Sequence, residues 1–260
     1  MSMRLTGTRP SRGSDAAGLR KWAMIFLATG VLGQGLIQNG LLNMGTVTGT
    51  ELLSAMQDNP AVMAMATFAL MCKVTETCAV PLFAMLLVEG FLHTGSFRKY
   101  ILRVGGLALV SELPYNLALG KGLIDLGSRN PVCSLVICLA MLYLYNRYGE
   151  KGLKNTLIKA LVTLAAFLWC VMLRIDHGIF VVIMVAFLWR VRGKNNFRAV
   201  FACGGAMVCA AFNLFYIGSG FACMILHRYN EERGEQNPAF NYGFYPGLLL
   251  FVAVASRFLA

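Results

Sequence analysis

Long runs without a charged side chain constrain this chain more than any other feature of its sequence. Four stretches contain no Asp, Glu, Lys or Arg: residues 22–50, 131–146, 199–226 and 236–256. A helix that crosses a bilayer needs ~20 mostly apolar residues, and the strict alternation of a membrane β-barrel is absent. Only 13% of the residues are charged, whereas a soluble domain carries about 25%. The sequence therefore predicts an all-α fold, a polytopic integral membrane helical bundle.

We expect eight or nine transmembrane helices in a single domain, residues 21–260, after a disordered basic tail, residues 1–20. The apolar stretches that define the spans are residues 22–43, 78–92, 100–119, 131–146, 156–173, 178–189, 199–226 and 240–258. The stretch 199–226 is either one long span or two that turn near residues 216–220. Residues 61–71 are apolar but short, and Lys73 and Glu76 interrupt them, so we expect them to lie at the interface or to re-enter the membrane.

The net charge of +11 follows from where the Lys and Arg residues lie. With nine spans, every basic loop falls on the same side as the N-terminus, and cytoplasmic loops are the ones enriched in Lys and Arg. This pattern predicts a protein of the inner (cell) membrane, surrounded by lipid, with its N-terminus in the cytoplasm. It also indicates that nucleic acid is not a partner, because the basic residues are accounted for by the cytoplasmic loops. None of the eight cysteines has the paired spacing of a zinc site, and no metal is expected.

A first group of ionisable residues lies near the cytoplasmic ends of two predicted spans. Such residues cost at least ~2.5 kcal/mol each to insert, so each one is a functional candidate. Glu89 and His93 are four residues apart and share a helix face, and a carboxylate that orients an imidazole prepares it to act as a general base. Alternatively, Arg103 pairs with Glu89 to hold two spans together, and His93 lies at the interface without a catalytic role.

A second group lies toward the opposite side. Glu112 is ~20 Å along its helix at 1.5 Å per residue, close to the level of the short turn at Asp176 and His177. Adjacent residues on a helix do not face each other, so these two are not expected to form a pair by themselves. Alternatively, Asp176 and His177 belong to an ordinary solvated loop.

Five motifs follow one another between residues 79 and 250: PLFAMLLVEGFLHT at 81–94, RKYILRVGGLALVSELPYNL at 98–117, DHGIF at 176–180, YNEERG at 229–234 and FYP at 244–246. In this order they resemble the TraX family, known as conjugal-transfer pilin acetylases. The resemblance implies a multi-span membrane acetyltransferase that uses acetyl-CoA to acetylate an amino group, typically on a peptide.

The resemblance also implies roles for individual residues. The expected catalytic residues are His93, Glu89, Glu112, His177 and Asp176. The cations expected to hold the phosphates of CoA are Arg98, Lys99, Arg103, Arg190 and Arg192. The residues expected to contact the amine or peptide acceptor are Tyr115, Asn116 and Tyr245.

Three features depart from the family pattern. The family usually has an Asp-His pair within residues 27–34, and a His where this chain has Leu248; residues 45–77 also look unlike the family. An active enzyme would therefore use His93 or His177 instead. The departures favour, as an alternative, a non-catalytic membrane binding or transport protein on the same scaffold, with a polar cavity between the spans. A structural subunit of a conjugation or export complex is a third reading.

Overall fold

The computed structural model of the protein describes residues 13–42, 49–120, 122, 125, 127–150, 152–192, 197–235 and 237–259, and all its named elements are helical. In the first half of the chain these are α1 (Ala16–Leu32), η1 (Gly33–Leu41), α2 (Gly49–Asp58), α3 (Pro60–Thr77), α4 (Ala79–Leu92) and α5 (Phe97–Ala118). In the second half they are α6 (Val132–Arg147), α7 (Leu153–Met172), α8 (Gly178–Arg190), α9 (Arg198–Phe212), η3 (Leu214–Gly218), α10 (Ser219–His227) and α11 (Pro238–Leu259). The predicted all-α class is confirmed.

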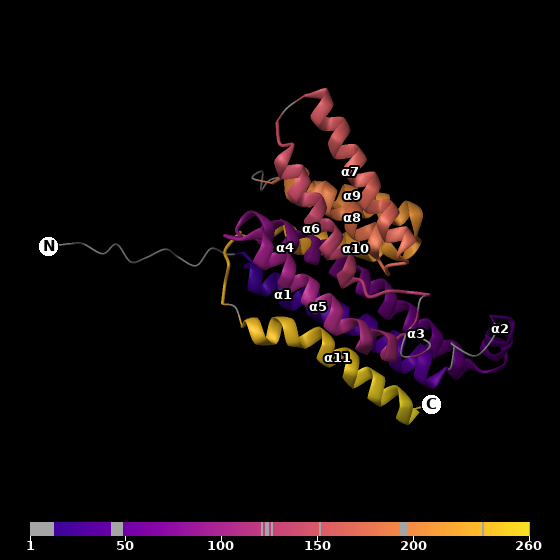
Figure 1. Ribbon diagram of the computed structural model, residues 1–260. Helices are drawn as coiled ribbons and strands as arrows, with labels where there is room; N and C mark the ends of the chain where they lie inside the picture. The colour runs from indigo at the N-terminus through magenta and orange to yellow at the C-terminus, as the bar shows by residue number, and fades with distance from the viewer. Residues whose placement is uncertain are drawn as a thin grey trace.

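The helices form a bundle in which α4 is central (Figure 1). Helix α4 packs against α1 on one side and α8 on the other, and most of its side chains are buried. Helix α11 lies along α5 and η1 at one edge of the bundle, while α7 stands at the opposite edge against α6 and α8 (Figure 1). Because α4 contacts both halves of the molecule, it brings residues of the first and second halves of the chain together.

Four helical stretches in the described part of the chain are long and apolar enough to cross a membrane: Ala16–Leu41, Pro60–Leu92, Leu153–Met172 and Pro238–Leu259. Four shorter apolar helices accompany them: Val132–Arg147, Gly178–Arg190, Arg198–Phe212 and Leu214–His227. The predicted count of eight or nine spans is therefore not confirmed, although the membrane character of the helices is. On α7 the leucines at four positions one turn apart are exposed, as a lipid-facing stripe requires: Leu157, Leu161, Leu164 and Leu168.

The segment before α4 is helical. Residues 61–71 belong to α3, and α3 and α4 together form one long apolar stretch, Pro60–Leu92. Their placement at the interface or as a re-entrant segment stays a prediction. Lys73 and Glu76 do not end this helix. Their side chains are three residues apart and pair at 3.0 Å, so the two charges compensate each other inside the bundle.

Two further segment boundaries differ from those predicted from the sequence. Helix α1 begins at Ala16, where the Asp15 side chain accepts a hydrogen bond from the Gly18 N–H at 2.6 Å, so the predicted disordered tail cannot extend to residue 20; residues 1–12 lie outside the described residues. The stretch 199–226 contains two helical segments rather than one long span. They turn at Asn213, whose side chain caps η3 by accepting the Phe215 N–H at 3.1 Å, and not near residues 216–220.

Helices α1 and α3 approach closely where Gly30 faces Glu76. A Cβ at position 30 would lie 2.3 Å from the Cβ of Glu76, so Gly30→Ala should force the helices apart and lower the free energy of unfolding by about 1–3 kcal/mol. Gly106→Ala on α5 is the matched control, because its Cβ meets nothing within 4 Å. The unfolding midpoint in detergent measures both. Equal midpoints for the two variants would contradict the close packing.

Candidate functional site

The first candidate site is at the C-terminal end of α4, where His93 follows the last helical residue. Its Nδ1 is 3.2 Å from Oε2 of Glu89 and 3.0 Å from the Glu89 carbonyl oxygen. The contact that the spacing predicted is therefore present. A protonated Nδ1 donates to Glu89, which leaves the lone pair on Nε2. The His93 side chain is 75% exposed and the Glu89 side chain 14%, so the imidazole is accessible while its partner is held in the bundle.

Arginines and a second carboxylate lie close to this pair. Glu89, Arg192 and Arg198 line one small cavity. Arg198 is buried, pairs with Glu231, and donates to the Tyr229 carbonyl oxygen at 3.3 Å. The guanidinium of Arg192 lies 3.8 Å over the ring of Trp189. We call Glu89, His93, Arg192, Arg198 and Glu231 the terminal cluster.

The structure does not bring every predicted cation into the terminal cluster. Arg98 and Lys99 are exposed on the first turn of α5, and Arg190 is exposed at the end of α8. Arg103 is also exposed, and in the described part of the chain Glu89 pairs with His93 instead. The alternative in which Arg103 pairs with Glu89 is therefore wrong.

A second candidate site lies inside the bundle around Lys73. Its Nζ is 3.0 Å from Glu76 Oε2 and 3.3 Å from His177 Nε2. The same Nζ is 3.4 Å from Gln34 Oε1 and 3.9 Å from Asp176 Oδ2. The Glu76 and His177 side chains are both only 8% exposed. We call Gln34, Lys73, Glu76, Asp176 and His177 the interior cluster.

Asp176 and His177 occupy the turn between α7 and α8. His177 has a left-handed backbone with φ of 55°, which brings its Nε2 to 3.6 Å from Asp176 Oδ2. The prediction that adjacent residues would not pair is therefore wrong, because it assumed helical geometry. The reading of a solvated loop is also wrong for His177, whose Nδ1 is hydrogen-bonded to the Tyr216 hydroxyl and whose side chain is buried.

Asp176 is held ionised by its neighbours. Burial alone would raise its pKa, but the neighbouring His177 and Lys73 outweigh burial and lower the pKa below its usual value. The His177 N–H and the Tyr115 hydroxyl also donate to this carboxylate, at 3.0 Å and 3.3 Å. Tyr115, predicted to contact the acceptor, thus lies beside the interior cluster.

Glu112 was expected beside Asp176 and His177, but it pairs with a different residue. Its Oε1 is 3.5 Å from Nη1 of Arg129. The backbone of Arg129 in turn pairs with Arg174 and Asp176, with both N···O distances at 2.9 Å. Glu112 is therefore linked to the interior cluster through Arg129.

The two remaining predicted residues are buried. The Tyr245 hydroxyl donates to Oδ1 of Asn130 at 3.2 Å, and Asn116 lies on the last turns of α5. The hydrogen bond between Tyr245 and Asn130 anchors α11 to the segment before α6. The predicted role of Tyr245 and Asn116 in binding an acceptor stays a prediction.

Sequence reasoning missed Gln34, Lys73, Glu76 and Tyr216 as site residues. One signal was available: Lys73 and Glu76 are oppositely charged, three residues apart, and flanked by apolar sequence on both sides. Such spacing permits a pair on one helix face, and a charged pair inside a span is a functional candidate.

The fold and these clusters define, over the described residues, a helical protein with helices long and apolar enough to cross a membrane and with ionisable groups in its interior. The family model of the TraX protein matches residues 47–256, and the chain belongs to the TraX family. The match includes residues 47–77, so the expectation that residues 45–77 lie outside the family pattern is wrong for nearly all of that segment. No curated protein and no solved structure matches the chain.

Proposed function

We propose that this TraX-family protein is a membrane acyltransferase that transfers an acetyl group from acetyl-CoA to an amino group of a peptide or small amine. The observation that carries the proposal is the contact between Glu89 and His93 at 3.2 Å, with the imidazole exposed. Acetyl-CoA supplies the acetyl thioester. Such a transfer needs a general base on the protein, which accepts a proton from the attacking amine.

The residues of the terminal cluster fit this chemistry. Glu89 holds Nδ1 of His93, so Nε2 can take a proton from the amine as its nitrogen forms the new bond to the acetyl carbon. The carbon–sulfur bond breaks, and Nε2 returns the proton to the departing thiolate. The carboxylate of Glu89 lies beside the imidazolium that forms in between and compensates its charge.

The exposed cations around His93 fit the phosphates of CoA. Arg98 and Lys99 are exposed just after His93, at the start of α5, and Arg192 lies over Trp189 at the end of α8. Arginine is suited to phosphate because its planar group can form two parallel hydrogen bonds. These three residues are the proposed phosphate contacts, together with the exposed Arg190 and Arg103.

The proposal includes a topology with this end of the bundle in the cytoplasm. The N-terminal segment reaches the same end, since Ser14 pairs with the Arg228–Asn230 backbone and Arg198 donates to Tyr229. Aromatic contacts join the other helix ends there, with Phe91 against Trp189 and Phe97 against Tyr143. A shared end rich in Lys and Arg supports a cytoplasmic N-terminus in the inner membrane.

Binding of acetyl-CoA tests the proposal directly. Purified protein in detergent with acetyl-CoA at 100 times its dissociation constant should gain about 2.7 kcal/mol of stability, seen as a higher unfolding midpoint. Radiolabelled acetyl-CoA with a panel of peptide and small amines should give labelled product. Absence of both the shift and the product would overturn the proposal.

The interior cluster favours a second candidate, a non-catalytic membrane binding or transport protein. Ionisable side chains inside a membrane often mark an ion or substrate pathway, and Lys73, Glu76 and His177 meet within 3.8 Å of one another. This candidate predicts no acyl transfer with any amine. Detection of an acetylated product would reject it.

A further inference from the structure

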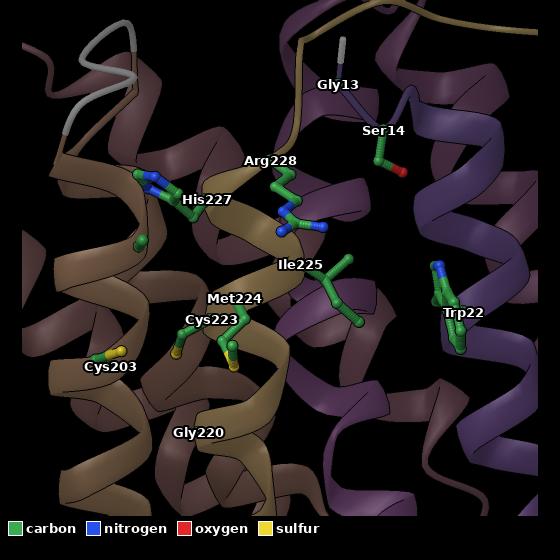
Figure 2. Close-up of a pocket in the computed structure, with 11 residues that line it drawn as sticks. Gly13, Ser14, Trp22, Cys203, Gly220, Cys223, Met224, Ile225, His227 and Arg228 are labelled. Carbon is green, nitrogen blue, oxygen red and sulfur yellow. The ribbon is translucent and has the colours of Figure 1, made fainter.

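A groove lies between three helices on the side of the bundle, and one of its ends lies close to the terminal cluster, since its lining residues Ala199 and Arg228 adjoin Arg198 and Tyr229. It has a volume of about 760 Å³, within the ~300–1,000 Å³ of typical ligand sites. Helix α10 forms its floor, and α9 and α1 form its walls (Figure 2). The residues that line it are Gly13, Ser14, Trp22, Ala199, Cys203, Gly220, Cys223, Met224, Ile225, His227 and Arg228.

Small side chains create the groove. Gly220 and Cys223 on α10, with Ala199 and Cys203 on α9, leave room that larger residues would fill. A Cβ at position 220 would meet no atom within 4 Å. The space is therefore a consequence of the sequence of two facing helices.

The groove is apolar along its length and cationic at one end. Met224, 70% exposed, and Trp22, 47% exposed, form its apolar part, and Arg228 and His227 lie at the end of α10. Figure 2 shows the Arg228 side chain extending from α10 toward the space beside Ser14. No ion pair in the described part of the chain involves Arg228.

The cationic end is held in place by backbone hydrogen bonds. The Ser14 N–H donates to the Arg228 carbonyl oxygen at 2.8 Å, and the Ser14 carbonyl oxygen accepts the Asn230 N–H at 3.0 Å. The segment before α1 is thereby fixed to the segment after α10. A ligand that enters the groove meets a preformed polar end, which lowers the entropic cost of binding it.

We infer that this groove binds an anionic phospholipid, with its phosphate at Arg228 and an acyl chain along the apolar floor. Phe221 and Val200, which follow the lining residues Gly220 and Ala199 in the sequence, are exposed, and exposed apolar surface of this kind suits contact with lipid. Basic pockets between helices on the cytoplasmic side are suited to acidic head groups. Complementary charge at one end and apolar surface elsewhere match the two parts of such a lipid.

An acyl-CoA thioester shares a phosphate and an apolar chain with this lipid, but it fits the groove less well. Its nucleotide carries several further polar groups, and the lining offers only Ser14, His227 and Arg228 as polar side chains near the end. The thioester is therefore a competing outcome of the test.

The test measures lipid binding by native mass spectrometry on detergent-purified protein, with phosphatidylglycerol as the anionic lipid and phosphatidylcholine as the zwitterionic one. The wild-type protein should bind phosphatidylglycerol more tightly than phosphatidylcholine. Arg228→Gln should weaken that binding about 10- to 100-fold, the effect of losing a charged hydrogen bond, and leave phosphatidylcholine unchanged. Arg147→Gln, an exposed arginine at the end of α6, should bind like wild type.

A second variant tests the apolar part. Gly220→Leu places a side chain in the open groove and should abolish retention of both lipids, whereas Gly106→Leu, also in open space, should not. Unfolding midpoints without added lipid check that each variant is folded. Equal binding of the two lipids by wild type, unchanged binding by Arg228→Gln and Gly220→Leu, or tighter binding of palmitoyl-CoA than of phosphatidylglycerol would each overturn the inference.

Discussion

His93→Ala should lower the rate of acetyl transfer by about 10²- to 10⁴-fold, the usual effect of removing a general base. The imidazole is the exposed member of the terminal cluster, and its Nε2 is the atom proposed to take the proton from the amine. Its loss should leave the unfolding midpoint nearly unchanged, because an exposed side chain contributes little to packing. Initial rates with radiolabelled acetyl-CoA measure the change.

The Glu89→Gln variant separates the role of the base from that of its partner. Nδ1 of His93 also faces the Glu89 carbonyl oxygen at 3.0 Å, which the substitution keeps, so the imidazole should remain oriented while losing a negative neighbour. The expected rate lies between those of wild type and His93→Ala. Full activity in His93→Ala would show that the base is another residue, with His177 the next to test.

Lys73→Met should destabilise the protein by about 3–5 kcal/mol, the cost of leaving a buried charge without its partner. The methionine fills a similar volume but leaves Glu76 and Asp176 without the ammonium that lies 3.0 Å and 3.9 Å from them. The unfolding midpoint in one detergent measures the effect. Lys154→Met is the matched control, because Lys154 is exposed at the start of α7, and it should change stability by no more than ~0.5 kcal/mol.

The double variant Lys73→Met with Glu76→Gln tests whether the loss comes from charge. Removing both charges of the pair should recover at least half of the lost stability, since Asp176 and His177 remain beside each other at 3.6 Å. A midpoint for Lys73→Met equal to that of wild type would mean that the interior cluster does not depend on this ammonium.

The class of fold could be predicted from the sequence because membrane helices follow from local composition. Charge-free runs and ordered TraX motifs are contiguous features, and both were sufficient to predict an all-helical membrane protein and its family. The Glu89–His93 contact was equally local, since it follows from a spacing of four residues on one helix.

The interior cluster could not be predicted in the same way. Apart from Glu76 on the same helix, the residues around the Lys73 ammonium come from η1 and from the turn before α8, and the sequence does not indicate that these segments meet. Glu112 was placed by depth alone, and depth gives no information about which way a side chain faces around the helix axis. The pairing of Asp176 with His177 depends on a left-handed residue that no local pattern indicated.

Synthesis of the chain gives the Lys73–Glu76 pair a further consequence. Proteins are made from the N-terminus onward, so α3 reaches the membrane while His177, 104 residues later, has not yet been translated. A lone ammonium at that stage would oppose insertion of the helix. Because Lys73 has a carboxylate one turn away on the same helix, the segment enters the bilayer as an electrically neutral unit, and the later residues join an arrangement that is already compensated.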